Sequence, residues 1–87
     1  MAIKDYDEAI RLNPKIAGAY VFRGLAWSGK MDYDNAIKDF SEAIRLDPEY
    51  AHPYDGRGAA WSGKKEYDKA IRDHDMAIRH DPKSDFF

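Results

Sequence analysis

The chain contains no cysteine among its 87 residues. Disulfide frameworks, cysteine-ligated zinc and thiol catalysis are therefore excluded. No apolar run approaches the roughly 18 residues of a membrane span, and the first residues lack the apolar region of a signal peptide. We therefore expect no membrane partner, and we take the cytoplasm as the default compartment.

The sequence also lacks an excess of charge of either sign. Lys and Arg number 14 against 16 Asp and Glu, which gives a net charge of −2. A surface that binds nucleic acid normally needs clustered basic residues, so we expect no nucleic-acid partner. Hydrophobic residues make up 44% of the chain and charged residues 34%, an ordinary globular balance.

Residues that could carry chemistry are present but are not arranged for it. His74 and His80 are six positions apart, which is not the i, i+4 spacing that places two metal ligands on one helical face. We expect His74 to pack between helices and His80 to face the C-terminal end of a helix dipole. The aspartates are not paired with a recognisable nucleophile or base. We predict no metal site, no cofactor and no catalytic residue, and hence no enzyme.

The sequence repeats itself. Pro14, Pro48 and Pro82 are about 34 residues apart, the length of a two-helix solenoid repeat. Segments 17–50 and 51–84 are identical at more than half of their aligned positions. The first residues match the second half of each repeat. We therefore predict a single domain, 1–87, divided into a lone second helix of a truncated repeat (1–16), two full repeats (17–50 and 51–84) and a tail (85–87).

The first half of each repeat reads as a helix. In residues 17–28, Tyr20, Gly24 and Trp27 lie at i, i+4 and i+7, on one helical face. Gly29 is expected to adopt a left-handed conformation that ends this helix. The next repeat follows the same plan, and Pro53 suits the first turn of its first helix.

The second half of each repeat reads as an amphipathic helix. Residues 33–46 carry an apolar stripe, Asp32 or Asp34 can cap the N-terminus, and Pro48 disfavours helical geometry before it. Short loops imply antiparallel neighbours. The predicted helices cover residues 3–12, 17–28, 33–46, the corresponding first helix of the second repeat, and 67–80.

Two pairs of positions recur in both repeats. Gly24 and Ala36 are about one hairpin apart, and we expect small side chains there to let the two helix backbones approach closely. Arg23 and Asp39 also lie on the two helices of one hairpin. Two readings are open for them: an ion pair, or independent surface charges, and an exposed pair would contribute only about 0–1 kcal/mol.

The pattern from Tyr20 through Gly24, Trp27 and Tyr33 to Pro48 closely resembles the tetratricopeptide repeat. The resemblance covers nearly the whole chain. It implies an all-α fold, a right-handed superhelical solenoid of antiparallel helix pairs with about two and a half repeats. The departures are Arg23 and Arg57, where the family usually has leucine, and His74, where it usually has an aromatic residue.

The resemblance further implies a scaffold whose first helices line a concave groove that holds a peptide or partner protein. Helical spacing gives the candidate groove residues Val21, Leu25, Ser28, His52, Asp55, Ala59 and Ser62. The alternative is that these positions are exposed without a ligand. Some family members grip a C-terminal carboxylate with Lys, Arg and Asn. The positions that would carry this clamp have none of these side chains: Val21, Leu25, Asp55 and Ala59.

A second function class is a self-assembling structural unit. Two and a half repeats leave apolar surface incompletely covered at both ends, which favours association. The candidates are Ile3, Tyr6 and Ile10 at one end, and Ile71, Met76, Ile78, Phe86 and Phe87 at the other. The ends can stack between chains, or a hairpin can open at Gly29 or Gly63 and exchange a helix with a second copy. The alternative is a frayed monomer.

Overall fold

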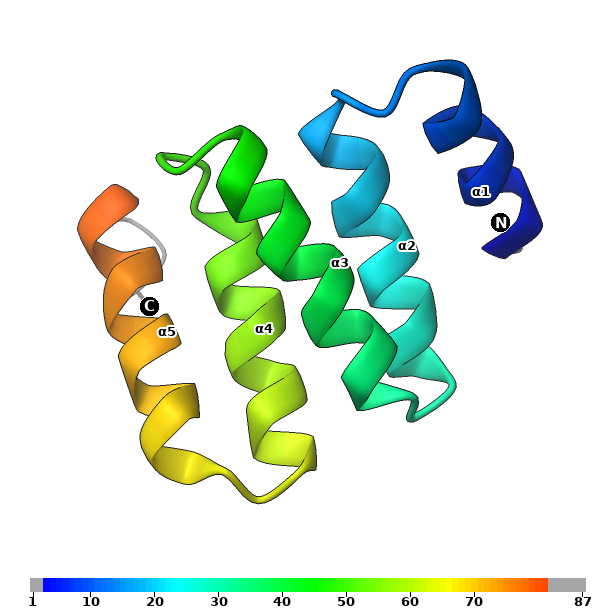
Figure 1. Ribbon diagram of the computed structural model, residues 1–87. Helices are drawn as coiled ribbons and strands as arrows, with labels where there is room; N and C mark the ends of the chain where they lie inside the picture. The colour runs from blue at the N-terminus through cyan, green and yellow to red at the C-terminus, as the bar shows by residue number, and fades with distance from the viewer. Residues whose placement is uncertain (1–2, 82–87) are drawn as a thin grey trace.

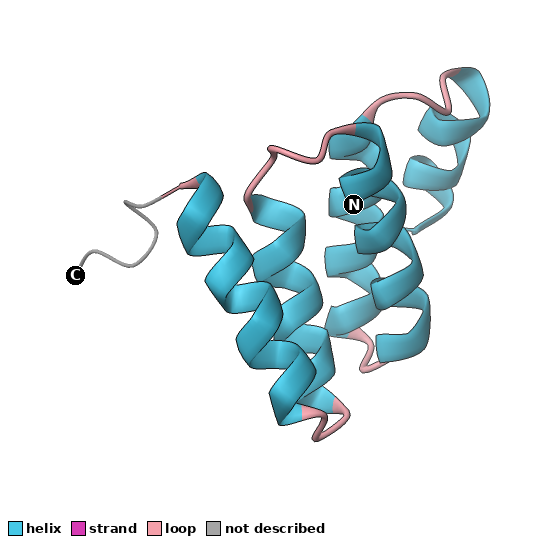
Figure 2. Cartoon of the chain, turned by 60° about the vertical axis from the view of Figure 1, so that its left-hand side comes forward, coloured by secondary structure: helices cyan, strands magenta, loops and turns pink. Residues whose placement is uncertain are grey.

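A computed structural model describes residues 3–81, which form five α-helices and no strand within that range. The helices lie in a row, each antiparallel to the next, with α1 at one end and α5 at the other (Figure 1). A view turned by 60° shows α4 and α5 side by side at the C-terminal end (Figure 2). The bounds are α1 Ile3–Leu12, α2 Ala17–Gly29, α3 Tyr33–Leu46, α4 His52–Gly63 and α5 Tyr67–His80.

The predicted all-helical repeat solenoid is confirmed, and the predicted helix bounds are matched to within a residue or two. Asp32, not Asp34, caps α3, because its Oδ1 accepts a hydrogen bond from the Asn35 backbone N at 3.3 Å. Pro53 lies in the first turn of α4, as predicted, and is fully buried. Phe86 and Phe87 lie outside the described residues.

The prediction of a left-handed Gly29 is wrong. Met31 adopts the left-handed conformation, with φ 63°, and Lys65 does so in the next repeat, with φ 65°. The Asp32 N–H donates to the Trp27 carbonyl and the Met31 N–H to the Ser28 carbonyl, each at 2.9 Å. This is a Schellman motif, whose left-handed residue follows the last helical turn.

A single aromatic ring holds the middle of the solenoid together. Phe40 on α3 is fully buried, and glycines of two helices leave room for it. A Cβ atom placed on Gly24 of α2 would lie 2.9 Å from the ring, and one on Gly56 of α4 would lie 2.5 Å from it. The predicted packing role of Gly24 is therefore confirmed, although its closest contact is the Phe40 ring.

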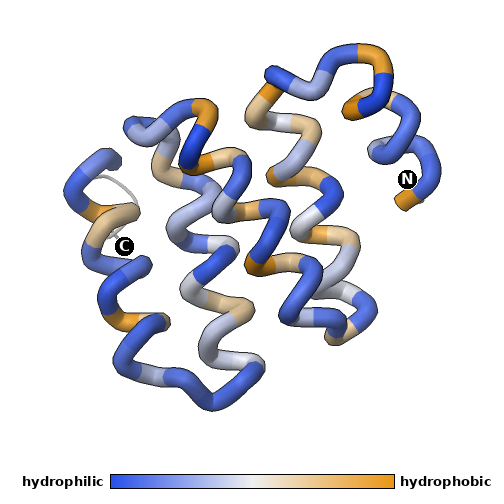
Figure 3. Tube along the Cα trace, in the orientation of Figure 1, coloured by the Kyte–Doolittle hydropathy of each residue, from blue (hydrophilic) through white to orange (hydrophobic). Residues whose placement is uncertain are grey.

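The buried residues around this ring lie mainly in the central helices of the row. Apolar positions are scattered among hydrophilic ones along α1, α3 and α5, whereas the trace of α2 is paler overall (Figure 3). The buried core cluster draws its residues from α2, α3 and α4, among them Val21, Ala36 and Ala60. Within the described chain, α1 contributes no buried residue.

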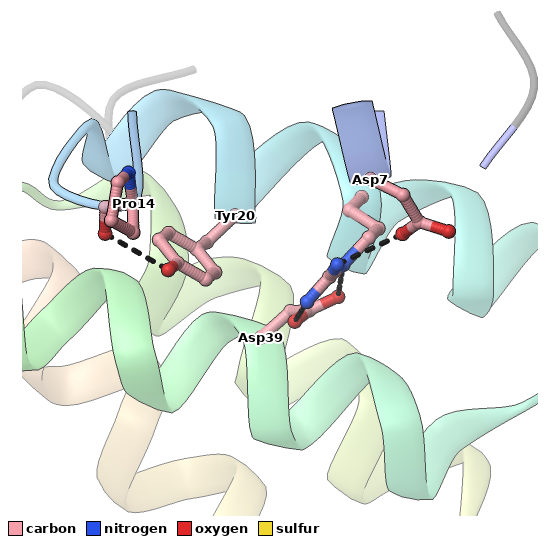
Figure 4. A network of polar contacts seen from close by, with 5 residues as sticks. Asp7, Pro14, Tyr20 and Asp39 are labelled. Carbon is pink, nitrogen blue, oxygen red and sulfur yellow. Dashed lines mark hydrogen bonds and ion pairs between the residues drawn. The ribbon is translucent and has the colours of Figure 1, made fainter. Parts of the chain in front are cut away.

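The two recurring arginines form the predicted ion pairs. Arg23 donates from Nε and Nη2 to both carboxylate oxygens of Asp39, at 2.8 and 2.7 Å, and from Nη1 to Asp7 of α1 at 2.9 Å (Figure 4). Asp39 is only 5% exposed. Hydrogen bonding to Asp39 raises the pKa of Arg23, so the guanidinium stays charged. The reading as independent surface charges is therefore wrong.

Each arginine thus joins three helices. Arg57 repeats the arrangement by binding Asp73 of α5 at 2.7 and 2.8 Å and the Ser41 hydroxyl of α3 at 3.0 Å. The preceding loop is tied down by a tyrosine, because the Tyr20 hydroxyl donates to the Pro14 carbonyl at 2.9 Å (Figure 4). Together these bonds orient each first helix against the helix on either side of it.

We predict that Gly24→Ala destabilises the fold by about 1–3 kcal/mol, because the added methyl group would overpack the buried Phe40 ring. Helix propensity alone would instead stabilise by up to about 1 kcal/mol. Urea unfolding measures the difference. Gly18→Ala is the matched control, because nothing beyond its own helix backbone and adjacent residues lies within 4 Å of the position that its added Cβ would take. A gain in stability for Gly24→Ala would contradict the packing role.

We expect Asp39→Asn to destabilise the fold by about 2–3 kcal/mol, since it removes the buried carboxylate that binds the partly buried Arg23 guanidinium through two hydrogen bonds. The control is Glu42→Gln, which removes the charge of an exposed pair with Arg45 and should change stability by about 0–1 kcal/mol. Equal effects of the two changes in urea unfolding would refute the special role of Asp39.

Candidate binding groove

An open groove of about 590 Å³ runs between α4 and α5. We call it the C-terminal groove. Gly58 and Ala70, both buried, lie at the contact between the two helices. Its remaining lining residues are Asp55, Ala59, Ser62, Tyr67, Ile71 and His74.

The groove is apolar at its α5 wall. Tyr67 is 58% exposed and Ile71 60% exposed, which is unusual for side chains of this size on a helix that packs in a repeat. Their equivalents one repeat earlier, Tyr33 and Ile37, pack against the buried core. The difference arises because α4 covers α3, whereas no helix within residues 3–81 covers α5 in the same way.

The α5 residues that line the C-terminal groove are therefore the repeat equivalents of the α3 residues on which α4 lies. Tyr33 meets Gly63 of α4, where an added Cβ would lie 2.4 Å from its ring. Phe40 meets Gly56, as described above. The groove offers Tyr67 and His74 at these two repeat positions, open to solvent.

One carboxylate supplies the polar feature of the groove. Asp55 Oδ1 is buried and makes no hydrogen bond among the described residues, although it lies 3.2 Å from His74 Nδ1. The predicted packing of His74 between helices is wrong, because its side chain is 65% exposed. A buried acceptor without a donor is unfavourable, so a donor that enters the groove would be stabilised there.

The residues proposed from the sequence do not all share this groove. Asp55, Ala59 and Ser62 line it. Val21 is only 5% exposed and belongs to the core, since α4 packs over it, so its side chain cannot face a ligand. The other three lie elsewhere on the same first helices: Leu25, Ser28 and His52.

These three residues differ in exposure. Leu25 is 50% exposed, and Ser28 is partly buried. His52 is exposed at the start of α4, and its ring meets Tyr50 edge-on at 5.4 Å. Leu25 and His52 are thus accessible to a partner from α2 and α4, outside the C-terminal groove.

Sequence reasoning missed Tyr67 as a groove residue and named Ile71 only as uncovered apolar surface. The repeat position of Tyr67, which is equivalent to that of Tyr33, was the signal that could have identified it. In the first full repeat, α4 covers this position on α3. On α5 the same position is open to solvent, because no further first helix follows within residues 3–81.

Residues 3–81 offer no metal site and no membrane-spanning helix. No group of three or more His, Asp or Glu side chains there could hold a metal ion. His80 stacks on Tyr54, with ring centroids 5.3 Å apart. A helix long and apolar enough to cross a membrane does not occur in this part of the chain.

Known proteins share this architecture. The tetratricopeptide repeat profile matches residues 17–50. The TPR2B domain of yeast Sti1, solved as a complex with pHsp70, is similar with a TM-score of 0.90 and 33% identity, over 94% of this chain and 66% of that one. The Arabidopsis OM64 TPR domain gives a TM-score of 0.92 and 29% identity, over 94% and 68%.

The MamA protein is also similar, with a TM-score of 0.86 and 30% identity, over 95% of this chain and 45% of that one. The chain thus spans about half the length of the MamA structures that it matches. A search of curated protein sequences found no match.

We predict that Ile71→Ala changes the free energy of unfolding by no more than about 0.5 kcal/mol, because the side chain lies open in the groove. The equivalent change Ile37→Ala should cost about 2 kcal/mol, because Ile37 packs under α4. Both are read from urea unfolding at low micromolar protein. Equal losses would show that the groove is closed in solution.

Proposed function

Because this chain belongs to the tetratricopeptide repeat family, we propose that it binds a protein or peptide through the concave face formed by its first helices, α2 and α4. Proteins of this family are generally scaffolds without enzymatic activity, and we propose the same here. The yeast Sti1 domain, which is 33% identical and was solved with pHsp70, supports a protein or peptide as the class of partner.

The observation that carries the proposal is the C-terminal groove with its buried, undersatisfied carboxylate. Contiguous exposed apolar surface beside a few polar groups is typical of a binding site. Asp55, Ala59 and Ser62 line this groove. We propose that the ligand extends from it towards the accessible residues of the same helices: Leu25, Ser28 and His52.

The charge of Asp55 limits the ligand. A carboxylate with a buried oxygen repels an acidic group and favours a cation or an N–H donor. None of the positions named for a carboxylate clamp carries a basic side chain: Val21, Leu25, Asp55 and Ala59. We therefore propose that the partner segment is neutral or basic where it enters the groove.

Selection from a random displayed-peptide library tests this function. The wild-type chain should enrich peptides that combine apolar residues with Lys or Arg. Asp55→Lys should lower the affinity for those peptides by about tenfold or more, by removing the attraction and adding a like charge. Affinities are measured by titration calorimetry.

Glu49→Lys is the matched control, because it makes the same charge change at an exposed loop position outside the groove. It should leave the affinity within about twofold, because exposed charges are screened. No enrichment by the wild type, or equal losses for the two variants, would overturn the proposed binding face.

A further inference from the structure

We propose that the C-terminal groove is also a docking site for a second copy of this chain, and that the segment it takes is α2. In the assembled state, α5 of one copy replaces α1 as the neighbour of α2 in the next copy. This proposal does not depend on the peptide-binding function, although both use the same groove. It gives a geometry to the self-association expected from the sequence.

The first support is the way in which α4 lies on α3. Three small residues of α4 face that surface: Gly56 against Phe40, Ala60 in the buried core, and Gly63 against Tyr33. Any helix that lies in the C-terminal groove in the same register must present compatible residues at these three positions. Side chains at i, i+4 and i+7 share one helical face.

The second support is that α2 carries a compatible face. The residues of α2 equivalent to those three are Phe22, Ala26 and Gly29. Nothing beyond the helix's own backbone and the adjacent residues lies within 4 Å of a Cβ position on Gly29, so the space beside it is free to receive a ring. In the docked state that ring is Tyr67, just as Tyr33 meets Gly63.

The larger Phe22 side chain also has a precedent within the chain. Phe22 stacks on Tyr6 of α1, with ring centroids 6.0 Å apart and planes 15° from parallel. Tyr6 occupies the same repeat position as His74. A Phe22 ring from a second copy would therefore stack on the exposed His74 as it does on Tyr6.

The third support is charge. Asp75 is the repeat equivalent of Asp7, which binds Arg23 of α2 at 2.9 Å. Asp68 is the equivalent of Asp34, which forms an ion pair with Lys64. Asp68 and Asp75 are both exposed on α5.

An incoming α2 would place Arg23 beside Asp75, and the following Lys30 beside Asp68. Both contacts repeat ion pairs that the chain already makes between a first helix and the second helix before it. The surface of α5 is thus complementary in charge to α2 of another copy.

The fourth support is that α1 is held weakly. It has no buried residue, and Phe22 remains 55% exposed beside it. The C-terminal groove offers two helices to α2, where α1 offers one. Because the incoming copy keeps its own C-terminal groove free, the contact is head-to-tail and can add further copies.

Sedimentation equilibrium over a dilution series tests the proposal. The wild-type mass should rise with concentration up to the high micromolar range. Asp75→Lys should weaken association by about tenfold or more, because it places a like charge beside Arg23. Asp7→Lys should strengthen association severalfold, because it loosens α1 from α2 and leaves Arg23 available.

Glu49→Lys should leave association unchanged, and circular dichroism confirms that each variant keeps its helices. A wild-type chain that stays monomeric at high micromolar concentration would overturn the proposal, and the groove would then be open to a different partner helix. The same change of direction for Asp7→Lys and Asp75→Lys would also overturn it, since the proposal requires the two changes to act in opposite directions.

The absence of cysteine permits a direct test of the register. Phe22→Cys and His74→Cys chains are prepared separately, mixed and oxidised with diamide. We expect mixed 22–74 disulfide dimers to exceed the 22–22 and 74–74 dimers by severalfold on a non-reducing gel. A statistical mixture of the three dimers would refute docking of α2 in this register.

Discussion

The position of one phenylalanine ring sets the spacing of the central helices. Phe40 fits only because both neighbouring helices have glycine where they meet it, Gly24 on one side and Gly56 on the other. Three helices are thereby brought to a distance at which Ala36 and Ala60 also become fully buried. Burial of this ring stabilises the fold by about 2–3 kcal/mol. Glycine in a helix interior costs about 1 kcal/mol relative to alanine, so the packing outweighs the propensity of either glycine.

The buried ion pairs act on a different property, the orientation of the helices. A guanidinium that binds a carboxylate through two parallel hydrogen bonds has a fixed geometry. Arg23 and Arg57 each make such a fork and also contact the second helix that precedes them. Buried pairs of this kind contribute less to stability than to specificity in several systems. Here they place each first helix at a defined angle to two neighbours, and they therefore position the face on which binding is proposed.

The helices could be predicted from the sequence because repeat register, capping residues and prolines all agree. The turn after α2 could not, because the sequence offers Gly29 for a left-handed position that Met31 takes. Glycine at position 63 is explained by the ring of Tyr33, so it reflects packing between repeats and not turn geometry. The candidate site was predicted less well. Helical spacing cannot distinguish a residue such as Val21, which the next first helix covers, from one that is open.

Comparison of equivalent repeat positions also explains why the groove is open and why its lining residues differ from those of the core. A repeat that lies under a following helix needs Phe40, whereas the equivalent His74 would be poorly suited to complete burial, since a buried imidazole needs hydrogen-bond partners for both nitrogens. An imidazole beside a carboxylate suits a surface that is open to solvent, because water reaches the exposed parts of both side chains. In the binding that we propose, a donor from the ligand replaces water beside these two side chains. Histidine at this repeat position therefore makes the last described repeat less suited to a buried core and better suited to the binding surface that we propose.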